Sequence, residues 1–205
     1  MSRLSENLVV GADHVRRTPE FSLEQRKILL NLAREAIASG IAGEPLSNVP
    51  PSSMHWDGLL EPRGVFTTLY IGDQLRGCVG YALPIRPLYR AVAETARAAA
   101  FEDSRFAPVT PVEAMELIIS LSILSLLSPI RPEQVEVGRH GLVISDGSRR
   151  GLLLPQVPVE NGWDREMFLE QTCRKAGLPT DAWRKSAMIE AFTAEVFGDE
   201  DLDRA

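Results

Sequence analysis

The feature that most constrains the fold is an ordered pattern of elements that occurs twice along the chain. Each copy begins with two short apolar runs joined by a tight turn, Gly72-Asp73-Gln74 in the first copy and Asp146-Gly147 in the second. Such runs around such a turn predict a β-hairpin. Each hairpin is followed by apolar residues at helical spacing and then by a third strand-like run. The copies span residues 64–126 and 141–197.

Glycines and arginines recur at matching places in the two copies. Gly64 and Gly141 each open the first strand, while Arg76-Gly77 and Arg150-Gly151 each lie in the second. The spacing between matched residues changes along the copies, so the pattern predicts a structural duplication rather than a tandem array. The expected elements are strands 64–71, 75–80, 116–126, 141–145, 151–155 and 188–197 and helices 88–101 and 164–177.

The edges of these strands bear on how the sheet is arranged. Six strands in two separate sheets would leave four edges, and unpaired edges promote aggregation. Merging the strands into one nearly closed sheet removes most of those edges. The sequence therefore predicts an α+β fold in which a duplicated strand–strand–helix–strand unit forms a barrel-like, mostly antiparallel six-stranded sheet with helices outside.

The duplicated region lies within one predicted domain that spans residues 21–198. An N-terminal arm over 1–20 precedes it and a C-terminal tail over 199–205 follows it. Inside the domain, the proline-rich stretch 43–63 is expected to be a long loop. These boundaries follow from changes in periodicity and composition along the chain.

Helix-end signals are clear at two places. Ser22-Leu23-Glu24-Gln25 has the spacing of a capping box, and the helix it opens is expected to stop at Gly40 in a left-handed conformation. Asp164 is expected to cap the helix of the second copy, with Gly177 as its stop.

Composition places limits on the environment and the partners. The chain has 205 residues, a net charge of −6 and two cysteines. That charge gives no footprint for nucleic acid or an anionic membrane surface. The first residues lack the apolar core of a signal peptide, so a reducing cytoplasm with both thiols free is expected. The uncharged run 117–130 is shorter than the ~20 residues that a membrane helix needs, and it predicts a buried strand.

The segment Leu75-Arg76-Gly77-Cys78-Val79-Gly80 carries the strongest candidate for chemistry. Glycine inside a strand marks a bulge or a close approach of another backbone or ligand. Strand alternation places Arg76 and Cys78 on one face, where the guanidinium would favour the thiolate form of Cys78. The alternative is that Cys78 is simply a small core residue. Arg76, Cys78, Gly77 and Gly80 are therefore candidate site residues.

Asp103 and Arg105 lie directly beyond the first predicted helix. An aspartate and an arginine in this position either form a structural ion pair or hold a substrate carboxylate or phosphate. Both readings stay open, and both residues are candidate substrate-binding groups.

Among the remaining reactive residues, His140 stands out because it lies between glycines before the first strand of the second copy. A Cys78–His140 pair would suit nucleophilic catalysis. Cys173 falls on the apolar stripe of its helix and is expected in the core. His14 and His55 are expected in solvated segments.

Several motifs are missing from the sequence. It has no phosphate-binding glycine loop, no dinucleotide-binding glycine pattern, no Cys-x-x-Cys and no closely spaced histidine pair. We therefore expect no dedicated metal site and infer no cofactor.

The sequence resembles the AMMECR domain family. The hallmark of that family is Leu-Arg-Gly-Cys-Ile-Gly, from which this chain differs only at Val79. The resemblance extends over roughly residues 22–198. Further matching segments are Ala98–Phe106, Gly151–Val157, Gly162–Asp164 and Cys173–Leu178.

This resemblance implies an α+β fold with a duplicated unit in a barrel-like sheet. Prokaryotic members resemble the A component of the AmmeMemoRadiSam system, which also contains a Memo-type protein and a radical SAM protein. By position, the resemblance points to Arg76, Gly77, Cys78 and Gly80 as the site.

Two functions follow as hypotheses. The preferred one is an enzyme, or an enzyme component, that acts on a small substrate together with those partners. Arg76 would orient an anionic group of a substrate, and Cys78 would be the nucleophile, acid–base group or redox thiol. The alternative is a non-catalytic module that docks on the Memo-type or radical SAM partner. Nucleic-acid binding is disfavoured by the net charge of −6.

Overall fold

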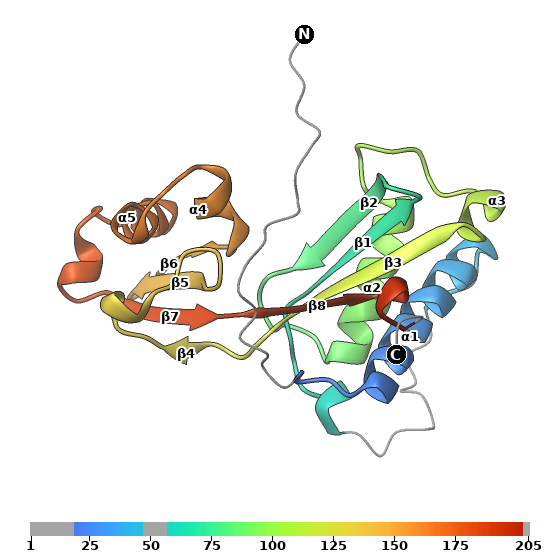
Figure 1. Ribbon diagram of the computed structural model, residues 1–205, viewed down its shortest axis with the longest axis horizontal. Coiled ribbons are helices and arrows are strands. Elements are labelled where there is room, and N and C mark those ends of the chain that lie inside the picture. The colour runs from blue at the N-terminus through green and yellow to red at the C-terminus, as the bar shows by residue number, and fades with distance from the viewer. Residues whose placement is uncertain (1–18, 47–56, 203–205) are drawn as a thin grey trace, which may run out of the picture.

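The computed structural model describes residues 19–46 and 57–202, which form two lobes (Figure 1). Each lobe is built on a four-stranded antiparallel sheet, in the order β2-β1-β3-β8 in the first lobe and β4-β7-β5-β6 in the second. The strands are β1 Val65–Ile71, β2 Gln74–Tyr81, β3 Leu117–Leu124, β4 Ser128–Pro129, β5 Gly141–Asp146, β6 Arg149–Leu153, β7 Met188–Phe192 and β8 Ala194–Gly198. The helices are α1 Leu23–Ile41, α2 Leu88–Phe101, α3 Pro111–Ala114, α4 Gln156–Glu160, α5 Arg165–Lys175 and α6 Asp199–Leu202.

Some predicted features fall outside these residues. They are residues 1–18 of the predicted arm, 47–56 of the predicted loop and 203–205 of the predicted tail, with His14 and His55 among them.

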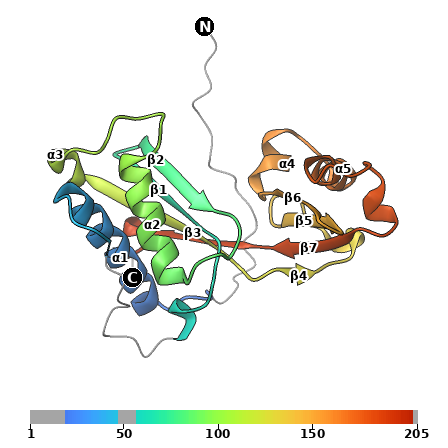
Figure 2. The same ribbon diagram turned by 180° about the vertical axis from the view of Figure 1, so that it is seen from behind.

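Helices cover one face of each sheet. In the first lobe α1 and α2 pack together, and α2 lies against β1 and β2 (Figures 1 and 2). The strands there alternate: Val65 and Leu69 are buried beneath α2, and Ile119 and Leu121 of β3 belong to the same core. In the second lobe α5 covers β5 and β6. The intervening residues of the first sheet therefore face away from the helices.

Two long strands connect the lobes. β3 runs on into β4, which pairs with β7, and β7 runs on into β8, which pairs with β3. The two strands meet where the Ser125 amide donates to the Thr193 carbonyl at 2.8 Å and the Thr193 amide donates to Ser125 Oγ at 3.0 Å. Figure 1 shows β7 and β8 running across the middle of the molecule.

The prediction of one barrel-like, nearly closed six-stranded sheet is wrong, because the strands form two four-stranded sheets. The segment expected as a single closing strand over 188–197 is divided at Thr193 into β7 and β8, which belong to different sheets. β8 of the second copy joins the first sheet, and β4, which follows β3, joins the second sheet, so the strands pair without closing a barrel. The α+β class is confirmed.

The order of elements within the two halves is the same. A hairpin, a helix and a third strand give β2-β1-β3 with α2 in the first lobe and β6-β5-β7 with α5 in the second. The matched glycines have matched surroundings, since a Cβ atom at Gly77 would overlap the Ala99 carbonyl of α2, and one at Gly151 would overlap the Ala176 backbone after α5. That the two halves superimpose remains a prediction.

The helix-end signals were mostly correct. The Ser22–Gln25 capping box is present, Asp164 caps α5, and Gly177 has the expected left-handed backbone with φ of 71°. The expected stop at Gly40 is wrong, because α1 continues to Ile41 and the left-handed residue is Gly43. Gly40 is instead required by the ring of Phe101, which occupies the space of a side chain.

No helix in residues 19–46 and 57–202 is long and apolar enough to cross a membrane. The uncharged run 117–130 forms β3 and β4 instead, with alternate residues of β3 buried against the helices.

Candidate functional site

The predicted motif lies on β2, which is the edge strand of the first sheet. Leu69 of β1 pairs with Gly77, whereas Tyr70 pairs with Leu75, so Arg76 is an extra residue in a β-bulge. A bulge bends the strand and redirects the extra side chain.

Arg76 is held by an ion pair to Glu113 in the first turn of α3. Arg76 Nε donates to Glu113 Oε1 at 2.9 Å, and the terminal nitrogen Nη2 donates to Oε2 at 3.2 Å. Glu113 also accepts from the amide and hydroxyl of Thr110 in a capping box. The hydrogen bond from Arg76, helped by those from Thr110, lowers the pKa of Glu113 to about 2. The arginine therefore braces the edge strand against α3.

The two motif glycines are required by close packing. Gly77 leaves room for the backbone of α2 at Ala99, and Gly80 lies under the ring of Phe66. A side chain at either position would force one of these neighbours to move.

Asp103 closes the outer edge of β2. Its carboxylate accepts from the Cys78 amide at 2.8 Å, an N–H that an edge strand leaves without a strand partner. The same carboxylate binds Arg105 Nε at 3.0 Å and Nη2 at 2.7 Å. These bonds, first those from Arg105 and then that from Cys78, hold the pKa of Asp103 well below its usual range.

Arg105 also lies within electrostatic reach of Cys78. The pKa of Arg105 is raised chiefly by its hydrogen bond to Asp103, and the negative charge of an ionised Cys78 adds to the effect. The guanidinium carbons of Arg105 and Arg76 lie 5.4 and 5.9 Å from the ring centre of Phe106, within cation–π range.

Cys78 is the motif residue whose side chain lies on the sheet face opposite the helices. Its thiol is half-buried and accepts a hydrogen bond from Thr68 Oγ1 at 3.4 Å. Cys173, by contrast, is 0% exposed in the second core, and burial raises the pKa of its thiol. The expected burial of Cys173 is confirmed.

We call the side of the first sheet opposite the helices the open face. At its end near the second lobe it is partly covered, since Phe66 packs against a cluster that includes Val143 and Phe192. The open face consists of small or uncharged side chains that alternate with the core residues of the four strands. They include Phe66, Thr68, Tyr70, Cys78, Gly80, Ile118, Ser120, Ser122, Val196 and Gly198.

His140 lies in the second lobe, in the turn before β5. Its Nδ1 accepts from the Glu136 amide at 3.0 Å, which requires an unprotonated nitrogen at that position. The hydrogen bonds of Cys78 go to Thr68 and Asp103 instead. The Cys78–His140 pair remains a prediction.

Sequence reasoning missed Glu113 and Thr68. Thr110-Pro111-Val112-Glu113 has the capping-box spacing, so a helix start at this position was recognisable. Its pairing with Arg76 joins residues 37 positions apart, which no local pattern reveals. Within the described ranges, no group of three or more His, Cys, Asp or Glu side chains could hold a metal ion.

The fold and the site define a class of protein: a two-lobed α+β protein with crossing strands and a glycine-bracketed cysteine on an edge strand. The AMMECR1 family model matches residues 30–197. This chain therefore belongs to the AMMECR1 family.

Relatives in other organisms support this assignment. A protein of Thermococcus gammatolerans is 46% identical over 193 residues, which cover 86% of this chain and 91% of the relative. Protein MK0488 of Methanopyrus kandleri is 43% identical, covering 89% and 92%. The crystal structure of protein PH0010 from Pyrococcus horikoshii is similar with a TM-score of 0.63 and 41% identity, covering 84% of this chain and 90% of that one.

Proposed function

We propose that this protein is a binding module whose open face docks a partner protein, with the Cys78 thiol inside the contact. The family resemblance makes a Memo-type protein or a radical SAM protein the candidate partner. The observation that carries the proposal is that the motif residues around Cys78 make structural contacts, while the Cys78 side chain lies on the open face.

The motif residues around Cys78 each have a structural task. Arg76 is paired with Glu113, Gly77 accommodates α2 and Gly80 accommodates Phe66. Arg76 and Arg105 are each paired with a carboxylate, so neither guanidinium carries an uncompensated charge, although the Nη1 atom of Arg76 is buried without a hydrogen-bond partner among the described residues. The motif builds a braced edge strand, and this supports a role in recognition.

The open face has the character of a contact surface. It is uncharged along its length, and Val196 on β8 is 63% exposed. An exposed apolar side chain on a rigid sheet favours a protein contact, because burying it against a partner is favourable.

A second candidate function is thiol-dependent catalysis on the same face, by an enzyme or enzyme component. The observation in its favour is that Thr68 donates to the sulfur while Arg105 lies within electrostatic reach of it. In that case Cys78 would be the nucleophile, acid–base group or redox thiol.

Binding measurements separate the two candidates. We would measure the affinity for purified Memo-type and radical SAM proteins of the same organism, using the parent, Val196→Arg and Val159→Arg. Val159 lies on α4 of the second lobe and is 50% exposed, so the same charge is added elsewhere. We expect Val196→Arg to weaken binding by about tenfold or more and Val159→Arg to leave it unchanged.

The thiol is tested in the same assay. Docking predicts that Cys78→Ala still binds within about threefold of the parent, since a single small contact is removed. If Val196→Arg and Val159→Arg bind the partner with the same affinity, the docking proposal is wrong.

A further inference from the structure

A straight row of four residues crosses the open face from Cys78. Thr68 of β1 pairs with Cys78 on one side and with Ser120 of β3 on the other, and Ser120 pairs with Gly198 of β8. Neighbouring strands lie about 4.8 Å apart, so Ser120 is about 10 Å from Cys78 across the sheet. The row is uncharged and ends at a pocket.

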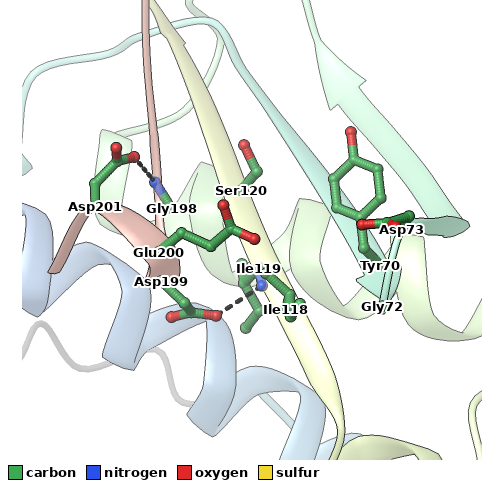
Figure 3. A pocket seen from close by; sticks show the side chains of 10 residues that line it. All are labelled: Tyr70, Gly72, Asp73, Ile118, Ile119, Ser120, Gly198, Asp199, Glu200 and Asp201. Atoms are coloured by element: carbon green, nitrogen blue, oxygen red, sulfur yellow. Dashed lines mark hydrogen bonds between the residues drawn. The ribbon is translucent and has the colours of Figure 1, made fainter. Parts of the chain in front are cut away.

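The pocket lies where β3, the β1–β2 turn and α6 meet (Figure 3). Its volume is about 330 Å³, and it is open to solvent on one side. Ser120 lines it, as do Tyr70 and Ile118, so it has hydroxyl groups, an aromatic ring and an apolar side chain. A volume of this size is sufficient for one small ligand or one long side chain.

Four carboxylates also line the pocket, and two of them already have partners. Asp199 accepts from the Ile119 amide at 2.7 Å and pairs with Arg34, and Asp201 accepts from the Gly198 amide at 2.8 Å. Within the described part of the chain, Asp73 and Glu200 form no ion pair or hydrogen bond. Figure 3 shows Glu200 reaching over β3 and Asp73 standing beside Tyr70.

This lining selects a cation that carries hydrogen-bond donors. Unpaired carboxylates repel anions and disfavour an apolar occupant, while a guanidinium or ammonium group can donate to them and to the hydroxyls. The Tyr70 ring adds a surface over which a cation is favourable.

We propose that this pocket receives an arginine or lysine side chain of the partner that docks on the open face. The inference rests on the proposed function and specifies the chemistry of the partner. The partner would lie along the row, with its basic side chain in the pocket and its neighbouring segment over Thr68 and Cys78.

The pocket can be tested without the partner by disulfide exchange at Cys78. The thiolate attacks a symmetric disulfide, forms a mixed disulfide with one half and releases the other half as a thiol. The probes are bis(6-aminohexyl) disulfide and its neutral match bis(6-hydroxyhexyl) disulfide, with the short bis(2-aminoethyl) and bis(2-hydroxyethyl) pair as a length control. Cys173 is fully buried and gives little background.

At pH 7 the aminohexyl group is protonated and long enough to reach the pocket. We expect the mixed disulfide at Cys78 to favour aminohexyl over hydroxyhexyl by about fivefold, the value of one partly exposed charge pair. The short pair is expected to show a smaller preference. Peptide mass mapping assigns the modified cysteine.

Two double variants test whether the preference for the aminohexyl group comes from the pocket carboxylates. Asp73→Asn with Glu200→Gln should abolish it, whereas Asp146→Asn with Glu160→Gln makes the same charge change in the second lobe and should leave it intact. Absence of a preference, an equal preference for the short amine, or a preference that survives in the first double variant would overturn the inference.

The partner assay keeps this inference distinct from the proposed function. We expect Asp73→Asn with Glu200→Gln to weaken partner binding by about tenfold, with the second-lobe variant unchanged. If Val196→Arg weakens binding but the pocket variant does not, docking stands and the pocket proposal fails. If no partner binds while the amine preference is found, the pocket remains and the proposed function fails.

Discussion

Arg76 and Glu113 form a two-point ion pair that connects the bulge of an edge strand to the first turn of α3, with contacts of 2.9 and 3.2 Å. Only 13% of the Arg76 side chain is exposed. The arginine of the family motif is thus part of the scaffold that presents Cys78, which makes the motif testable as architecture.

The ion pair predicts a pH-dependent contribution to stability. The pKa of Glu113 is lowered from 4.5 to about 2 in the folded protein, so this carboxylate stabilises the fold above pH 4.5 and loses that contribution as pH falls toward 2. We expect Glu113→Gln to lower the urea midpoint at pH 7, with the difference from the parent shrinking below pH 4.5. A difference that stays constant from pH 7 to pH 2.5 would contradict this account. Glu133→Gln, an exposed glutamate of the second lobe, is the control.

The motif glycines predict a steric cost. Gly77→Ala places a methyl group against the Ala99 carbonyl, and we expect a loss of about 1–3 kcal/mol in the free energy of unfolding. Gly80→Ala should cost a similar amount, and Phe66→Leu should restore part of it by removing the ring that it meets. Chemical denaturation of the three variants measures these changes. Full stability of Gly77→Ala would show that the strand and α2 are not held this closely.

The two thiols are predicted to react in a fixed order. Cys78 is half-buried on the open face, while Cys173 is enclosed and its thiol has a raised pKa because of burial. Iodoacetamide should therefore label Cys78 in the native protein and label Cys173 only on unfolding. Mass mapping that finds Cys173 labelled first would reverse the assignment.

Arg105, rather than Arg76, is predicted to influence the reactivity of Cys78. Arg105 lies within electrostatic reach of Cys78, while the guanidinium of Arg76 is held by Glu113. Arg105→Gln should slow alkylation of Cys78 at pH 7 by about twofold to fivefold, and Arg76→Gln should change it less. If Arg76→Gln slows alkylation more than Arg105→Gln does, with an unchanged circular dichroism spectrum, then Arg76 influences Cys78 as the sequence alone predicted.

Local sequence signals predicted local structure well. The Ser22 capping box, the extent of α2 and the Gly177 stop all follow from residues within one or two turns of each other. The arrangement of the sheets did not follow, because the crossing at Ser125 and Thr193 joins segments 68 positions apart and has no local signature. Overlaying residues 64–126 on 141–197 tests the predicted duplication directly.

The site was predicted in part for the same reason. Strand alternation correctly predicted the face on which Cys78 lies. It wrongly put Arg76 on the same face, because the β-bulge at Arg76 is visible only in the pairing of β1 with β2. Asp103 and Arg105 form an ion pair, which was one of the two alternatives that the sequence left open. Asp103 also accepts a hydrogen bond from the amide of Cys78, which lies 25 positions earlier in the chain. Such contacts depend on the tertiary fold.

The most direct test of the docking account is alkylation of Cys78 in the assembled complex. With a saturating amount of the partner, we expect the labelling rate of Cys78 to fall by about tenfold or more in the parent, because the open face is covered. At a partner concentration about ten times the Kd of the parent, the labelling rate of Val196→Arg should fall much less than that of the parent, because its affinity is about tenfold or more lower, and the rate of Val159→Arg should fall as in the parent. A Cys78 that reacts equally fast in the free protein and in the saturated complex would contradict the claim that this face is the contact surface.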